Sequence, residues 1–312
     1  MLTFFTTAKP FRGHSETIQR NALKSWTLLG ADVEGILFGD DEGAADTARD
    51  LGIRHEPHVE RSEYGAKRLD YMFTTARAIA RHEILCYINC DIILIEDFCC
   101  AIERIRTAHQ QFLMVGRRWD VDISRPWEFR RPNWQARLRG IVREGGRQRS
   151  PEWIDYFAFT RGLYGSSIPP FVVGRVHWDH WLVSKALDLK ARVVDVSAVV
   201  MAVHQNHDYS YHGQGKHGVW NDEEAGRNHQ LSGGWKHFRM ICDASQVLES
   251  NRLTGNKRLY WSITTRYARH VGRVLLFDGW LPIYFFLVGT TRPLRRRLRP
   301  RTLTLRRWGG NV

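Results

Sequence analysis

Three groups of acidic, amide and imidazole side chains in this 312-residue chain have the residue types of a catalytic or metal-binding site. Asn89 and Asp91 directly follow an apolar run, Asp179 lies among aromatic residues, and His204 follows a second apolar run. In open α/β sheets, ligands bind beyond the carboxyl ends of the strands. We therefore expect the three groups to meet at one edge of a single sheet.

The first group, Asn89-Cys90-Asp91, suits an oxygen-ligated divalent cation that carries a diphosphate, because it places a carboxylate beside an amide. An aspartate that only caps a turn is the alternative for this tripeptide. The pattern indicates a cation site only together with ligands from elsewhere in the chain.

The second group contains Asp179, which we expect in the first turn of a helix over 178–189. Pro169, Pro170 and Gly174 fix the backbone just before it. The amide dipoles of a helix start keep a carboxylate ionised, and such a group can accept a proton from a hydroxyl. A helix-capping aspartate beside core tryptophans is the alternative interpretation.

The third group follows the apolar run 199–203 and is rich in histidine and tyrosine over 203–212. A neutral imidazole from His204 with a carboxylate from another strand end is a common way to complete a metal shell. The spacings match no zinc ribbon and no HExxH helix. A structural histidine remains the alternative for each imidazole.

Apolar runs that alternate with helical repeats predict the elements that must position these groups. We expect strands at 2–6, 35–39, 52–55, 84–88, 112–116, 154–159, 192–196 and 199–203, and helices at 15–29, 44–51, 66–81, 97–109 and 178–189. The order predicts an α/β fold with a mostly parallel central sheet flanked by helices.

We expect a catalytic domain over 1–220 and a helical, basic extension over 221–312. Within the domain, residues 117–150 hold ten arginines against four acids and few aliphatic residues, which indicates an insertion or mobile flap rather than core. The chain shows no GxGxxG after the first strand, no GxxxxGK[ST] and no GxSxG. The usual nicotinamide enzymes, P-loop NTPases and serine hydrolases are therefore disfavoured.

The net charge of +13 is concentrated in two segments, 117–150 and 292–312, and the second holds eight arginines and no acid. Five cysteines in no paired spacing indicate free thiols in a reducing compartment. The first residues lack the pattern of a signal peptide, so we expect a cytoplasmic protein.

The combined motifs resemble the GT-A glycosyltransferase superfamily, including bacterial proteins of the family 2 type, along about residues 1–220. The segments that carry the resemblance are TTAKPF (6–11), FGDDEG (38–43), LCYINCDIIL (85–94), FLMVGRRWD (112–120), IDYFAFTRG (154–162), PPFVVGRVHWDHWL (169–182) and VHQNHDYSYH (203–212).

The resemblance implies a role for each matching position. Thr6, Thr7 and Lys9 would line the nucleotide loop, Asp40 would meet the base or ribose, Asn89-Cys90-Asp91 would be the Asp-x-Asp metal motif, Asp179 the catalytic base, and His204 a later metal ligand. The family's motif usually begins with Asp, so Asn89 leaves one fewer anionic ligand.

The function that we expect from the resemblance is transfer of a hexose from a nucleotide-sugar, UDP-linked by expectation, to an acceptor hydroxyl with inversion. Mn²⁺ or Mg²⁺ would stabilise the leaving diphosphate. Candidate substrate contacts are Arg117, Asp120, Asp155, Trp178 and His207, with Arg118 and Arg161 as further candidates for phosphate or acceptor contacts. A surface arginine is the alternative for each of the three arginines. The acceptor would be a saccharide or a lipid-linked compound in cell-surface polysaccharide or glycolipid synthesis.

An aromatic stretch at 274–291 precedes the eight arginines of the tail. This composition suits an interfacial anchor on the anionic inner face of the cell membrane, and no nucleic-acid partner is expected. A core helix with solvated arginines is the alternative for the stretch. For the whole chain, the alternatives are a sugar-nucleotide nucleotidyltransferase and a non-enzymatic membrane- or nucleic-acid-binding protein.

Overall fold

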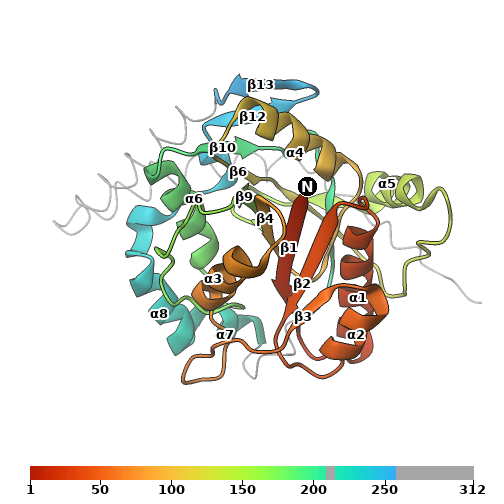
Figure 1. Ribbon diagram of the computed structural model, residues 1–312, viewed down its shortest axis with the longest axis horizontal. Coiled ribbons are helices and arrows are strands. Elements are labelled where there is room, and N and C mark those ends of the chain that lie inside the picture. Colours follow the sequence, from red (N-terminus) through yellow and green to blue (C-terminus); the bar gives the residue numbers. More distant parts are fainter. Residues whose placement is uncertain (209–214, 258–312) are drawn as a thin grey trace, which may run out of the picture. The chain divides into compact units, whose positions relative to one another are not determined.

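The computed structural model describes residues 1–208 and 215–257, which belong to one unit, Met1–Leu259 (Figure 1). The tyrosines and the histidine of 209–212 and the tail segment 274–312 lie outside the described residues. The expected membrane contact through that tail therefore stays a prediction.

Strands and helices alternate along the first part of the chain. The order is β1 (Leu2–Thr7), α1 (Gly13–Thr27), β2 (Val33–Phe38), α2 (Ala44–Leu51), β3 (Arg54–Glu56), α3 (Leu69–Ile79), β4 (Ile84–Ile88), β5 (Ile92–Ile93), α4 (Asp97–Ala108) and β6 (Phe112–Val115). The second part contains β7 (Arg118–Val121), α5 (Trp134–Gly145), β8 (Arg147–Gln148), β9 (Tyr156–Thr160), α6 (Trp178–Asp188), β10 (Arg192–Asp195), β11 (Ala202–Gln205), α7 (Gly215–Asn221), α8 (Glu223–Leu231), the short helices Gly234–His237 and Ile241–Asp243, β12 (Gln246–Glu249) and β13 (Arg252–Gly255).

A nine-stranded sheet in the order β13-β12-β10-β6-β9-β4-β1-β2-β3 forms the centre of the fold. Five of its neighbouring pairs are parallel, and β9 runs antiparallel to both β4 and β6. The predicted fold class, α/β with a mostly parallel sheet, is confirmed. Because β9 runs the opposite way, its start lies at the same edge as the carboxyl ends of β4 and β6.

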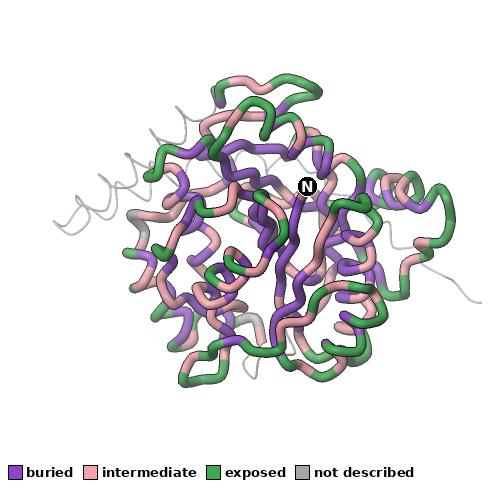
Figure 2. The backbone as a smooth tube through the Cα atoms, viewed as in Figure 1, coloured by how far each residue is buried: buried purple, intermediate pink, exposed green. Residues whose placement is uncertain are grey.

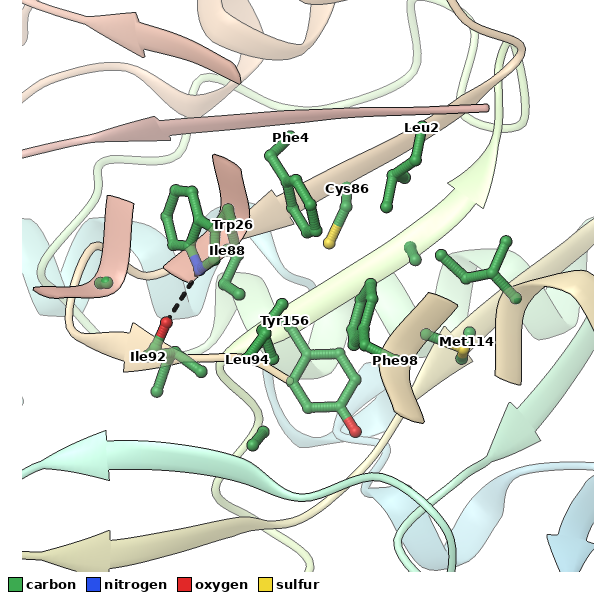
Figure 3. Close-up of a cluster of buried hydrophobic side chains, with 14 of the residues drawn as sticks. Leu2, Phe4, Trp26, Cys86, Ile88, Ile92, Leu94, Phe98, Met114 and Tyr156 are labelled. Atoms are coloured by element: carbon green, nitrogen blue, oxygen red, sulfur yellow. Dashed lines mark hydrogen bonds between the residues drawn. The ribbon is translucent and has the colours of Figure 1, made fainter. Parts of the chain in front are cut away.

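Helices cover both faces of this sheet, as the alternation of side chains along the strands requires. Phe4, Cys86 and Ile88 face a cluster with α1, α2 and α4, and Figure 3 shows part of that cluster, in which the Trp26 indole donates to the carbonyl of Ile92. The neighbouring strand positions face a second cluster with α3 and α6. The central strands are therefore buried on both sides (Figure 2).

A second sheet, in the order β5-β11-β7-β8, packs against α5 through a third apolar cluster. Val121 and Val203 from its strands are buried there with Leu138 of α5. The expectation that 117–150 stays outside the core is wrong for this part of the segment. Its arginines obscured an amphipathic helix and a strand whose apolar residues alternate with charged ones that pair with one another.

The sheet continues beyond residue 220, where we expected a helical extension to begin. Strand β12 pairs in parallel with β10, and β13 pairs antiparallel with β12. The polar composition of 246–255 suits edge strands, and its helical interpretation is therefore wrong. Among the described residues, none of the helices is long and apolar enough to cross a lipid bilayer.

Candidate active site

A cleft of about 1110 Å³ opens at the carboxyl ends of the parallel strands. The loop after β1, the turn after β4, the start of α6 and the end of β11 all contribute to its lining. Asp91, Asp179 and His204 all line it, as the sequence analysis expected from their positions after strands or at a helix start. The three groups therefore share one side of the sheet.

Strand pairing brings Asp91 and His204 together across a long stretch of sequence. After β4 the chain turns into β5, which pairs antiparallel with β11 and sets Ile92 opposite His204. The backbone amide of Gln205 donates to the carbonyl of Asp91 at 3.2 Å. These contacts hold the Asp91 carboxylate beside the end of β11.

Asp91, His204 and His207 form a cluster whose potential ligand atoms lie within 4.8 Å of one another. Asp91 Oδ2 is 3.1 Å from His207 Nε2 and 3.7 Å from His204 Nε2. The sequence analysis placed His207 with the substrate, whereas the structure brings it to the two expected metal ligands. Its position three residues after His204, at the end of a strand, is the signal for that proximity.

Two properties of Asp91 fit a cation ligand. Burial raises its pKa, but the charges of His204, His207 and Lys9 outweigh burial and hold the pKa well below the usual range of an aspartate. Its Oδ1 is buried and accepts no hydrogen bond from the described residues. An ionised oxygen with an open coordination position, beside two imidazoles, is a donor set that a divalent transition-metal ion such as Mn²⁺ accepts.

Asp179 lies in the first turn of α6, against the aromatic wall that the sequence predicted. Trp178 packs edge-on against Tyr87 at 5.3 Å between ring centroids, and both line the cleft. Burial raises the pKa of Asp179, and the charge of nearby Asp155 adds to this effect, while His180, 3.7 Å away, lowers it. A carboxylate that is 20% exposed, opens on a cleft and has a raised pKa is suited to accept a proton.

The residue that precedes this helix has a strained backbone. His177 has φ of 84°, in the left-handed region that non-glycine residues rarely adopt. Its ring lies 4.5 Å from that of His229, between centroids, and burial lowers the pKa of His177 to about 4. Strain of this kind is concentrated at functional sites, and here it sets the direction in which α6 starts.

A network of buried charges lies behind the cluster. The Arg118 guanidinium donates to both oxygens of Asp155, at 2.8 and 2.9 Å, and to Asp120 at 2.9 Å. The Asn89 amide donates to Asp155 at 2.7 Å. Asn89 therefore has a structural partner that an aspartate at this position would repel.

The other predicted nucleotide residues are distributed over the cleft and its surroundings. Thr7 and Lys9 line the cleft, while Thr6 is buried beneath it. Asp40 is exposed and pairs with Arg61 at 2.6 Å, whereas the adjacent Asp41 lines the cleft and pairs with Lys67. The Asp41–Lys67 pair was not predicted from the sequence, because neither residue stands out before the two loops are brought together.

Three of the candidate substrate residues lie elsewhere. Arg117 donates to the carbonyl of Arg149, and Asp120 faces Arg118 and His204, so neither lines the cleft. Arg161 donates to the carbonyls of Arg77 and Ala80, at the end of β9 away from the cleft. Each makes a structural contact that the residue type alone does not reveal. Asp155, Trp178 and His207 do line the cleft.

Fold and site together define an α/β protein whose central sheet carries a carboxylate–imidazole cluster and a separate, partly buried carboxyl group at its carboxyl edge. Neither a protein-family model nor a curated protein matches the chain.

Solved structures with a similar arrangement include TarS 1–349 of S. aureus, which matches 65% of this chain at 11% identity and a TM-score of 0.44. This chain spans 60% of that structure's length. A second example is glucosyl-3-phosphoglycerate synthase of Mycobacterium tuberculosis, solved with Mn²⁺, UDP-glucose and phosphoglyceric acid. The match covers 75% of this chain and 80% of the chain of the synthase, at 16% identity and a TM-score of 0.44.

Proposed function

We propose that this protein is a metal-dependent glycosyltransferase of the GT-A type, which transfers a sugar from a nucleotide-sugar to an acceptor hydroxyl. The observation that carries the proposal is that one cleft is lined by both the Asp91–His204–His207 cluster and the partly buried carboxyl group of Asp179. Glycosyl transfer needs these two functions: charge stabilisation at the leaving diphosphate and a base at the acceptor.

The cluster would hold the divalent cation through one carboxylate and two imidazoles. When bound, such an ion supplies positive charge that stabilises the departing diphosphate. Two nitrogen ligands favour Mn²⁺ over Mg²⁺, since Mg²⁺ prefers oxygen donors. Lys9 would add a cationic group for the phosphates. Burial lowers the pKa of Lys9, and the negative charge of Asp91 opposes this effect.

The nucleotide would bind at the β1 and β2 ends of the cleft. Thr7, Lys9 and the Asp41–Lys67 pair line this part, and the Lys67 ammonium also donates to the carbonyl of Ala8 at 2.7 Å. A buried ion pair with fixed partners offers both a donor and an acceptor to a base or ribose. A UDP-sugar is the donor that we propose.

Asp179 would take the proton of the acceptor hydroxyl as that oxygen attacks the anomeric carbon. A single base on the side opposite the leaving group gives in-line displacement and inversion of the anomeric centre. General-base assistance of this kind contributes about 10²–10⁴ in rate. The acceptor would be a saccharide or a lipid-linked compound in cell-surface polysaccharide or glycolipid synthesis, with the protein at the cytoplasmic face of the membrane.

The test is a donor screen, beginning with UDP-sugars and Mn²⁺, that follows release of the nucleoside diphosphate by wild type and Asp179→Asn. We expect turnover to fall about 10²–10⁴-fold in the variant with donor affinity retained. Asp188→Asn removes an exposed carboxylate at the other end of the same helix and should behave as wild type.

Turnover of Asp179→Asn at the wild-type rate with acceptor present contradicts the assignment of the base. Release of pyrophosphate instead of nucleoside diphosphate would indicate a nucleotidyltransferase. The anomeric configuration of the product, read by NMR coupling constants, tests inversion separately.

A further inference from the structure

The two ring nitrogens of His204 face two different carboxylates. Nε2 lies 3.7 Å from Asp91 Oδ2, on the side of the cluster, while Nδ1 lies 3.1 Å from Asp120 Oδ1. The second contact is within hydrogen-bonding distance but off the direction of the ring N–H, and no other described residue bonds to Nδ1. His204 therefore has one carboxylate on the cleft side and one behind it.

Strand register, rather than a chance rotamer, sets Asp120 behind His204. Strands β7 and β11 are parallel neighbours, and Asp120 pairs directly with His204 in their register. Paired residues of adjacent strands project to the same face of the sheet, with their Cβ atoms close together. The backbone of the second sheet thus fixes the carboxylate at the rear nitrogen of the ring.

Asp120 is itself held from two other directions. Arg118 donates to its Oδ1 at 2.9 Å, and Arg149 Nε lies 3.3 Å from its Oδ2. Arg118 also binds Asp155, so two arginines face two carboxylates. Since these charges already balance, Asp120 does not need His204 as a counter-ion, and the imidazole contact has to be explained in another way.

We propose that Asp120 is a positioning residue, which fixes His204 in the tautomer that carries its proton on Nδ1 and so leaves the lone pair of Nε2 toward Asp91. The proposal rests on the metal site of the proposed function. Histidines that bind metals commonly donate their other N–H to a carboxylate, which sets both ring orientation and tautomer. From the sequence, Asp120 was a candidate substrate contact, but its side chain does not line the cleft.

The first test needs neither metal nor activity. Long-range ¹H–¹⁵N correlation of the metal-free, histidine-labelled wild type at about pH 8.5, above the ordinary imidazole pKa of about 6.5, reports which ring nitrogen carries the proton. His204→Ala assigns the signals. We expect the Nδ1-protonated form at His204. A predominantly Nε2-protonated ring in the wild type overturns the proposal, even if no Asp120 variant folds.

The second test measures Mn²⁺ affinity by the EPR signal of the free ion. Asp120→Asn should bind Mn²⁺ about 10–100-fold more weakly, as expected for loss of an outer-shell partner, and should lose the tautomer preference. Asp120→Glu, which keeps the carboxylate, should recover part of the affinity. Wild-type affinity with an unchanged tautomer in Asp120→Asn contradicts the proposal.

The matched control is Glu128→Gln. Like Asp120, Glu128 lies in segment 117–150, faces two arginines (Arg131 and Arg137) and does not line the cleft. Unlike Asp120, it is exposed. This variant removes one carboxylate without touching His204, so affinity and tautomer should stay at wild-type values. An effect equal to that of Asp120→Asn would indicate general electrostatics and sink the positioning role.

Failure of the two proposals is distinguishable. If no donor is turned over, but Asp120→Asn alters both Mn²⁺ affinity and the tautomer, the positioning role stands and only the transfer reaction falls. If the tautomer is as expected but the wild type binds no Mn²⁺, the metal site and the positioning role toward it both fall.

Discussion

Each residue of the Asp91–His204–His207 cluster should make a measurable contribution to Mn²⁺ affinity. His207→Ala removes a ligand of the proposed metal site, and we expect Mn²⁺ binding to weaken by about 100-fold or more, since even outer-shell partners contribute about 10–100-fold. Wild type should also bind Mn²⁺ more tightly than Mg²⁺. Titration of the free protein with each ion checks both. His58→Ala, an exposed histidine that packs on Tyr71 outside the cleft, is the control and should not change affinity.

The proposed role of Asp179 as the base predicts the acid side of the pH–rate profile. Asp179 has to be ionised to accept a proton, and burial raises its pKa above that of an ordinary aspartate, about 3.9. We therefore expect kcat/KM to fall as pH is lowered, beginning at a higher pH than an exposed aspartate would give. The residual activity of Asp179→Asn should lack this limb. A limb of the same midpoint in that variant would assign it to another group.

Residue types predicted which side chains meet at the cleft, but the contacts of individual side chains could not be predicted from the sequence. Asp91, Asp179 and His204 were predicted from strand ends and a helix start, and the structure brings them to one cleft. Asp41 was not singled out from the sequence, and Asp120, which we expected to contact the substrate, does not line the cleft. Each has a partner that comes from a loop or strand far away in sequence. A partner of this kind leaves no local pattern, so only the tertiary structure reveals it.

Strand β6 is followed by Gly116, which leaves room for the side chain of Tyr156. A Cβ on Gly116 would lie 2.0 Å from the hydroxyl of Tyr156 in β9, which Figure 3 shows inside the first core cluster. Gly116→Ala should destabilise the protein by about 1–3 kcal/mol, the usual cost of overpacking. Urea unfolding measures it.

The same hydroxyl provides the control for this prediction. It is buried and has no hydrogen-bond partner among the described residues, so Tyr156→Phe should be neutral or stabilising. The penalty of Gly116→Ala should shrink in the Tyr156→Phe background, because the closest clashing atom is gone. Strict additivity of the two changes would show that the contact is not the cause.

Helix α4 carries a carboxyl group that should make stability depend on pH. Burial raises the pKa of Asp97 to about 6, although Arg139 lowers it in part. Because the folded pKa exceeds the unfolded one, the contribution of protonated Asp97 is fully present below about pH 4 and lost as pH rises through about 6.

Asp97→Asn should therefore flatten this dependence and raise stability near neutral pH by roughly 1–3 kcal/mol, since one pKa unit corresponds to about 1.4 kcal/mol. Urea unfolding at several pH values is the measurement. Glu96→Gln is the control, because Glu96 is exposed and shares the Arg139 partner. If both variants shift the pH dependence equally, loss of the arginine contact is the cause.

Sequence periodicity predicted most elements of the central sheet, whereas of the second sheet it predicted only β11, which the strand expected at 199–203 overlaps. The strand at 84–88 and the helix at 44–51 have the predicted bounds, because apolar runs and a terminating glycine define them. Helix α1 begins at Gly13 instead of after Ser15, and Arg12 caps it without a side-chain bond. Strand β7 was missed since its charged residues pair with one another inside the protein.

Deletion of 292–312 distinguishes the proposed glycosyltransferase from a non-enzymatic membrane- or nucleic-acid-binding protein. The residues of the cleft all lie between 7 and 238, so the shortened protein should keep its affinity for the nucleotide-sugar. It should lose binding to vesicles of anionic lipid, because basic residues contribute on the order of 1 kcal/mol each at such a surface. Vesicle co-sedimentation at two salt concentrations measures this. Loss of nucleotide-sugar binding would favour a non-enzymatic binding protein.

The reversed strand at the centre of the sheet has a consequence for synthesis on the ribosome. Strand β9 fills the gap between β4 and β6, although both precede it in the chain. Until residue 160 has left the exit tunnel, β4 keeps one open edge and β6 keeps two, because the other neighbour of β6 is β10, which comes later still. Such edges pair readily with other chains. A nascent chain stalled before this point is thus expected to recruit chaperones more strongly than one that has passed it.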